Sequence, residues 1–115
     1  MGETGGKDFI IAHKSANAKA LATAIIRGGF EYQGQKCSAV SRVYMPDNLW
    51  EEVKQYLLED VRSISIGDVE DFSNFMGAVI SEAAFDKIAN NIDNARKDEL
   101  AEIIAGGEYD KSKGY

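Results

Sequence analysis

Cysteine, histidine and proline are scarce in this sequence, and the scarcity of the first two excludes a disulfide and a zinc site. The 115 residues contain one cysteine, one histidine and one proline. A single cysteine, Cys37, cannot form an internal disulfide, and with only one histidine no zinc site of cysteines and histidines is expected. One thiol and no disulfide favour a reducing compartment. We expect this to be the cytoplasm, or the mitochondrial matrix if the source is a eukaryote.

Basic charge and long apolar runs are scarce too. Lysine and arginine number 13 against 19 acidic residues, which gives a formal net charge of −6. This balance argues against a nucleic-acid-binding surface, which needs clustered cations. No apolar run approaches the roughly 18 residues that a membrane-spanning helix needs. We therefore expect neither nucleic acid nor a membrane as a partner.

What is present indicates a globular protein, because 44% of the residues are hydrophobic, and 115 residues form one domain at most. Short apolar runs alternate with stretches that carry apolar residues at helical spacing, which favours parallel strands joined by helices. The predicted fold is a three-layer, open, mainly parallel sheet with flanking helices. Strands are expected near 8–12, 41–45 and 101–105. Helices are expected near 16–30, 48–62 and 82–96. The side chains expected to be buried are Ile10, Ile25, Val43, Val53, Ile88 and Ile103.

Three polar residues are predicted to cap these helices. Ser15 precedes the first helix and Ser81 precedes the third. Asn48, with Glu51 three residues later, resembles a capping box at the start of the second.

Two glycine-marked strings carry the residues with the most chemistry. Residues 2–8 read GETGGKD and residues 30–39 read FEYQGQKCSA. A carboxylate such as Glu3 can activate water, and a thiolate such as Cys37 can attack a carbonyl. Lys36 and a helical turn expected to start at Cys37 would both favour the thiolate. The plainer alternatives are a buried structural cysteine and a solvated carboxylate near the terminus.

Both strings, in this order and at this spacing, resemble the aldehyde dehydrogenase family. The threonine of ETGGK, the string FEYQGQKCSA and the later MGAVI (76–80) are similar to its 1-pyrroline-5-carboxylate dehydrogenase branch. The resemblance implies an NAD-dependent oxidation of L-glutamate γ-semialdehyde, a small aldehyde, to L-glutamate in proline catabolism. It implies that Cys37 is the nucleophile and that Glu3 is the base that hydrolyses the thioester.

Four further residues gain a role from the same resemblance. It implies that Ser38 contacts the α-carboxylate of the substrate and that Lys36 adds positive potential for it. Gly5 would let the backbone pass close to the nicotinamide, and Lys87 would approach the nicotinamide ribose. No metal site is implied. Without the resemblance, Ser38 is a serine that bonds the backbone, and Lys36 and Lys87 are solvated surface lysines.

Members of the family carry a Rossmann NAD-binding domain before ETGGK and an E-[IV]-F-G-P segment after the cysteine. The 115 residues contain neither the Rossmann glycine motif nor the E-[IV]-F-G-P segment. We therefore expect residues 1–115 to be part of a catalytic domain, inactive alone, without bound NAD, and self-associating as a homo-oligomer through uncovered apolar faces and strand edges. Two alternatives stay open. One is a non-catalytic α/β interaction or assembly module with an incidental cysteine, and the other is thiol-dependent hydrolysis without NAD.

Overall fold

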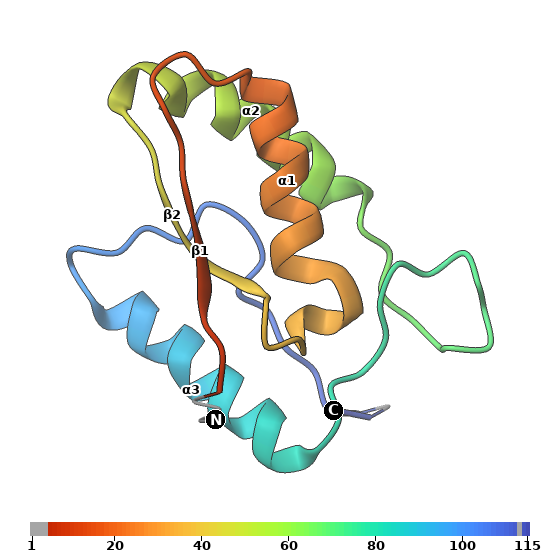
Figure 1. Ribbon diagram of the computed structural model, residues 1–115. Helices are drawn as coiled ribbons and strands as arrows, with labels where there is room; N and C mark the ends of the chain where they lie inside the picture. Colours follow the sequence, from red (N-terminus) through yellow and green to blue (C-terminus); the bar gives the residue numbers. More distant parts are fainter. Residues whose placement is uncertain (1–4, 113) are drawn as a thin grey trace, which may run out of the picture. The chain divides into compact units, whose positions relative to one another are not determined.

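Two parallel strands and two long helices build the part of the chain that ends at Gly77 (Figure 1). The computed structural model describes residues 5–112 and 114–115. Its N-terminal unit, Met1–Gly77, contains β1 (Asp8–Ile11), α1 (Ala18–Phe30), the short 3-10 segment η1 (Glu31–Gly34), β2 (Val40–Tyr44) and α2 (Asp47–Ser63). The second unit, Ala78–Tyr115, contains α3 (Glu82–Lys97).

The sheet pairs β1 with β2 in parallel, so the predicted α/β class with parallel strands is confirmed. Ile10 lies opposite Val43, and Ile11 lies opposite Tyr44. The rings of Phe9 and Tyr44 meet edge to face, with centroids 6.4 Å apart. Parallel pairing requires a long crossover between the strands, and α1 supplies it. Figure 1 shows the two strands running side by side, with α1 and α2 packed against each other.

Small side chains on α1 let the elements of this unit approach closely. The buried cluster consists of Ala12, Ala18, Leu21, Ala22, Leu49 and Val53. At the other end of α1, a Cβ atom on Gly28 would lie only 2.7 Å from a methyl carbon of Val40, at the start of β2. The end of α1 therefore closes onto β2, and the loop between them, which carries Cys37, is held at both ends.

The predicted third strand is wrong. Residues 101–105 adopt no regular structure, and the described part of the second unit contains one helix and no strand. Val53 is fully buried as expected, and Ile10, Ile25 and Val43 are half-buried. Ile88 and Ile103 are exposed, contrary to expectation. A unit with a single helix offers no second layer against which that helix could bury its apolar face.

The predicted caps hold at one helix of three. Ser81 caps α3, because its hydroxyl accepts from the Ala84 N–H at 3.2 Å. The cap of α1 is Asn17 rather than Ser15, and its side chain accepts from the Ala20 N–H at 2.9 Å. Asn48 lies inside α2 and donates instead to the carbonyl of Lys14 at 3.2 Å.

Within the second unit, the segment after α3 folds back onto that helix through polar contacts. The Tyr109 hydroxyl donates to the carboxylate of Asp93 at 3.0 Å, and the Tyr109 ring meets Phe85 edge to face at 5.8 Å. Lys111 forms ion pairs with Glu82 at 2.7 Å and Asp86 at 3.1 Å. None of the helices in the described part of the chain has the length and apolar character that a membrane span requires.

Candidate active site

Cys37 lies in a tight turn between η1 and β2. The turn spans residues 36–39 and is closed by the Ala39 N–H, which donates to the carbonyl of Lys36 at 3.0 Å. Cys37 and Ser38 are both exposed, so the thiol is not a buried structural group in this chain. The helical turn expected to start at Cys37 is not formed. The chain passes instead into β2, whose residues pair with β1.

The end of the ETGGK string lies against the backbone of Cys37. The Lys7 N–H donates to the Cys37 carbonyl at 3.3 Å. A Cβ atom on Gly6 would lie 2.7 Å from Cys37 Cα and closer still to its carbonyl oxygen, so only glycine fits at position 6. The two strings that the sequence singled out are therefore brought together. Glu3 itself lies outside the described residues.

Three consecutive residues of the string reach this contact with positive φ angles. Gly5 and Gly6 have φ of 89° and 65°, and Lys7 has φ of 130°. Such angles cost a glycine little but strain a residue with a Cβ atom. Nothing lies within 4 Å of a Cβ built on Gly5, so the backbone there is open to close approach.

The segment just before Cys37 is strained as well. Tyr32 (φ 54°, ψ 40°) and Gln33 (φ 56°, ψ 25°) are left-handed, and Gly34 follows with φ of 66°. A left-handed conformation costs a non-glycine residue roughly 1–2 kcal/mol. A Cβ on Gly34 would lie 2.8 Å from the carbonyl oxygen of Gly29, so the turn also packs tightly on the end of α1. Sequence reasoning identified only a polar turn here, because neither tyrosine nor glutamine signals this conformation.

Charged side chains next to the turn form one cluster. Glu31 pairs with Arg27 and with Lys36, whose Nζ lies 2.9 Å from Glu31 Oε2. The Lys36 hydrogen bond, followed by the charge of Arg27, holds the pKa of the Glu31 carboxyl below its ordinary value. Two cations against one carboxylate leave one net positive charge on the cluster. The Lys36 ammonium is thus paired with Glu31, and its role in adding positive potential for a substrate stays a prediction.

Lys87 belongs to the second unit, where it is exposed on α3, and its role stays a prediction. In the described part of the chain, no three histidine, cysteine or acidic side chains group in a way that could hold a metal ion.

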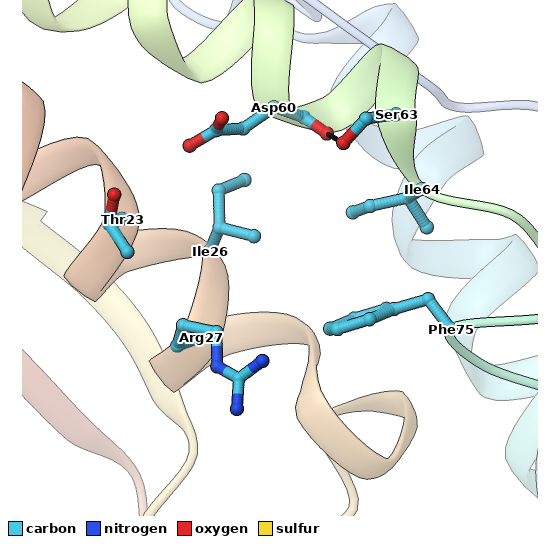
Figure 2. Close-up of a pocket in the computed structure, with 7 residues that line it drawn as sticks. All are labelled: Thr23, Ile26, Arg27, Asp60, Ser63, Ile64 and Phe75. Carbon is cyan, nitrogen blue, oxygen red and sulfur yellow. Dashed lines mark hydrogen bonds between the residues drawn. The ribbon is translucent and has the colours of Figure 1, made fainter.

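A separate cavity of about 220 Å³ opens between α1, the end of α2 and Phe75 (Figure 2). Figure 2 shows Ile26, Ile64 and Phe75 turned toward one another across it, with Arg27 at one side and Asp60 at the other. Thr23 and Ser63 complete its lining, and Ser63 donates to the Asp60 carbonyl at 2.6 Å. None of the predicted site residues that the structure describes lines this cavity, so it is distinct from the Cys37 turn.

The whole chain, residues 1–115, matches the family model described as the aldehyde dehydrogenase family. The chain therefore belongs to the aldehyde dehydrogenase family.

Among curated proteins, it is 48% identical over 115 residues to the mitochondrial delta-1-pyrroline-5-carboxylate dehydrogenase of Emericella nidulans, covering 100% of this chain and 20% of that protein. It is 50% identical to the protein of that name from Danio rerio, covering 99% of this chain and 21% of that one. The chain thus spans about a fifth of the length of these relatives.

Solved structures agree on the fold. The delta-pyrroline-5-carboxylate dehydrogenase of Mycobacterium tuberculosis bound with NAD superposes with a TM-score of 0.93 at 47% identity, over 98% of this chain and 21% of that one. Lactaldehyde dehydrogenase from Escherichia coli superposes with a TM-score of 0.89 at 26% identity, over 98% of this chain and 24% of that one. Because both structures superpose well, the backbone fold alone does not distinguish similarity to one enzyme from similarity to the other. The higher sequence identity accompanies the pyrroline-5-carboxylate dehydrogenase.

Proposed function

We propose that this chain is the nucleophile-bearing part of an NAD-dependent dehydrogenase that oxidises L-glutamate γ-semialdehyde to L-glutamate in proline catabolism. The observation that carries the proposal is the contact between the ETGGK string and Cys37: the Lys7 N–H donates to the Cys37 carbonyl, and Gly6 leaves no room for a side chain beside it. The relatives near 50% identity bear the corresponding name. Their names also include the mitochondrion, so in a eukaryotic source we propose the mitochondrial matrix.

In this mechanism Cys37 acts first. Its thiolate adds to the aldehyde carbon, and the carbonyl oxygen becomes an oxyanion. NAD, when bound, accepts the hydride that this carbon loses, and a thioester on Cys37 Sγ remains. Glu3 then takes a proton from water as the water attacks the thioester carbon, and the carbon–sulfur bond breaks. The acid leaves and the thiol is restored.

The described residues fit only one edge of an NAD site. Gly5 offers open backbone to a flat ring, whereas Gly6 is filled by the Cys37 backbone. The pyrophosphate of a dinucleotide is commonly bound where a glycine turn leads into a helix. Here the glycines lead into strand β1. We therefore propose that the rest of the site lies in the longer protein and that the 115-residue chain alone neither binds NAD tightly nor oxidises aldehydes.

The substrate assignment rests on Ser38 and on the positive cluster beside it. Ser38 is exposed in the same turn as Cys37, where its hydroxyl can donate to a carboxylate. Arg27, Glu31 and Lys36 add one net positive charge nearby. A site built to bond a carboxylate rejects an analogue that lacks one, because its polar groups are then left unpaired.

The test uses the longer dehydrogenase that contains this sequence, with Cys37→Ala, Glu3→Gln and Ser38→Ala variants. Cys37→Ala should abolish NADH formation. Glu3→Gln should keep a first-turnover burst of NADH and slow the steady state, since only hydrolysis of the thioester needs the base. Ser38→Ala should raise KM more for glutamate semialdehyde than for propanal.

Each assignment has an outcome that would defeat it. Full activity in Cys37→Ala would favour the non-catalytic module, and ester hydrolysis with no NADH formed from any aldehyde would favour the thiol hydrolase. A missing NADH burst in Glu3→Gln with Cys37 still reactive would remove Glu3 as the deacylation base. Equal KM increases on both substrates would leave the aldehyde dehydrogenase class without this substrate.

A further inference from the structure

Gln33 links the strained turn before Cys37 to a distant loop of the same unit. With its amide oxygen turned toward Gly77, the side chain accepts from the Gly77 N–H at 3.0 Å and its NH2 donates to the Tyr32 carbonyl at 3.0 Å. In the opposite orientation the amide oxygen of Gln33 would face only acceptors and its NH2 group only donors. Hydrogen bonding therefore favours the orientation described. One side chain thus bonds backbone groups of Tyr32 and Gly77, which lie 45 positions apart in the sequence.

The loop that receives Gln33 is itself well braced. The Phe75 N–H donates to the Ser65 carbonyl at 3.0 Å, and the Gly67 N–H donates to the Met76 carbonyl at 3.1 Å. A Cβ on Gly77 would lie 3.1 Å from a methyl carbon of Val69 and 3.3 Å from the Gly67 carbonyl oxygen. These contacts therefore hold the Gly77 N–H in place.

The turn that Gln33 holds needs an external restraint. Tyr32 and Gln33 are both left-handed, which local sterics disfavour in each residue. Strained conformations persist where surrounding contacts over-determine them, and they gather at functional sites. The Gln35 N–H donates to the Tyr32 carbonyl at 3.0 Å, so the Gln33 amide and Gln35 share that acceptor at the turn. The next bond along the chain, Ala39 N–H to Lys36 carbonyl, closes the turn that carries Cys37.

We propose that Gln33 is a positioning residue for Cys37. Its amide ties the left-handed turn at 32–34 to Gly77 and thereby fixes the turn at 36–39 that presents the thiol. Gln33 does not touch substrate in this role and acts through the backbone. The proposal rests on the proposed function only in its effect on catalysis, because its structural part concerns the backbone around Cys37 alone.

Backbone hydrogen–deuterium exchange in the 115-residue chain tests the structural part. Gln33→Met keeps the length of the side chain but removes both hydrogen bonds. We expect exchange at Gly77, Gln35 and Ala39 to accelerate at least about tenfold, while the α3 cap amide of Ala84 stays unchanged. Gln55→Met, the same change at an exposed glutamine of α2, is the matched control and should leave all four rates unchanged.

Gln33→Glu is the rescue variant. It keeps an oxygen that can accept from Gly77, so exchange at Gly77 and Ala39 should return to within about threefold of the parent chain. This variant also keeps the test decisive if Gln33→Met does not fold. Faster exchange at Gly77 with an unchanged rate at Ala39 would overturn the proposal, because the bond would then exist without fixing the Cys37 turn. No restored protection in Gln33→Glu would overturn it as well.

In the longer dehydrogenase, Gln33→Met should lower kcat at least about tenfold with little change in KM for NAD, since misplacing a reacting group by about 1 Å can cost roughly 100-fold. A changed KM for NAD with unchanged kcat would contradict the positioning role. If the parent protein has no dehydrogenase activity, the proposed function fails, and the exchange experiment still decides the role of Gln33.

Discussion

Gly6 and Cys37 lie so close that a Cβ atom on Gly6 would be 2.7 Å from Cys37 Cα. This contact holds one of the two glycine-marked strings against the residue with the most chemistry in the other. Position 6 requires glycine for two reasons. Its φ of 65° disfavours a residue with a Cβ atom, and the Cys37 backbone leaves no room for a side chain.

Gly6→Ala should therefore destabilise the N-terminal unit by about 1–3 kcal/mol, the range for forcing extra atoms into a packed site. Urea unfolding followed by Trp50 fluorescence measures the change. Gly5→Ala is the control for backbone strain alone, because Gly5 lies in the same unit, also has a positive φ, 89°, and has nothing within 4 Å of an added Cβ. Equal losses in both variants would show that the Cys37 contact adds nothing.

Val53 should be the most sensitive core position of α2. Its side chain is 0% exposed, so Val53→Ala leaves a cavity and should cost about 1–3 kcal/mol of unfolding free energy. Val69→Ala makes the same deletion at a side chain that is 74% exposed and should change stability by less than about 0.5 kcal/mol. Chemical denaturation of both variants checks the difference, and a Val69 loss as large as that of Val53 would refute this account of the core.

The Glu31 cluster should respond to acid. Because the folded-state pKa of Glu31 is lowered, the stability that it contributes is present above pH 4.5, its ordinary value, and is lost as the pH falls through the lower folded-state pKa. Titration of the Glu31 side-chain resonances by NMR should give a midpoint below 4.5, and Lys36→Met should raise it. Lys111→Met, which removes a lysine of the second unit, should leave it unchanged. An unmoved midpoint in Lys36→Met would contradict the ion pair.

Tyr109 should titrate at high pH because the hydrogen bond to Asp93 stabilises its protonated form and raises its pKa above the ordinary 10.0. The associated stability is present below pH 10.0 and is lost as the pH rises through the higher folded-state pKa. Asp93→Asn should lower the midpoint, followed by NMR of the Tyr109 ring, whereas Asp98→Asn at the end of α3 should not. A shift of equal size in both variants would rule out the specific bond.

The apolar side chains on the two strands should drive self-association of the 115-residue chain. Ile11 is 73% exposed, and Phe9 and Tyr44 are more than half exposed. Light scattering should detect oligomers, and Ile11→Lys should shift them toward monomer, because a charge on an exposed strand opposes further pairing. Leu100→Lys adds the same charge at an exposed leucine of the second unit and should have the smaller effect. A clean monomer in the parent chain would refute the expectation.

Local sequence was sufficient for the helices of this protein. α1, α2 and α3 begin and end within about two residues of their predicted positions, since apolar spacing and flanking turn residues act over a few residues. The pairing of the two glycine-marked strings was also readable, because their resemblance to one family implied a shared site. The sequence could not predict that Ile88 and Ile103 are exposed, because the burial of a side chain depends on whether another helix or strand packs over it.

Tertiary structure alone decided how Cys37 is held. Neither string reveals that Gly6 must lie against Cys37, that Tyr32 and Gln33 are left-handed, or that Lys36 is bonded to Glu31. The amide of Gln33 reaches Gly77 because α1 and the braced loop at 65–77 bring distant backbone groups together. Residue types and short-range spacing set helices and chemistry, whereas such contacts join positions that become neighbours only after the chain has folded.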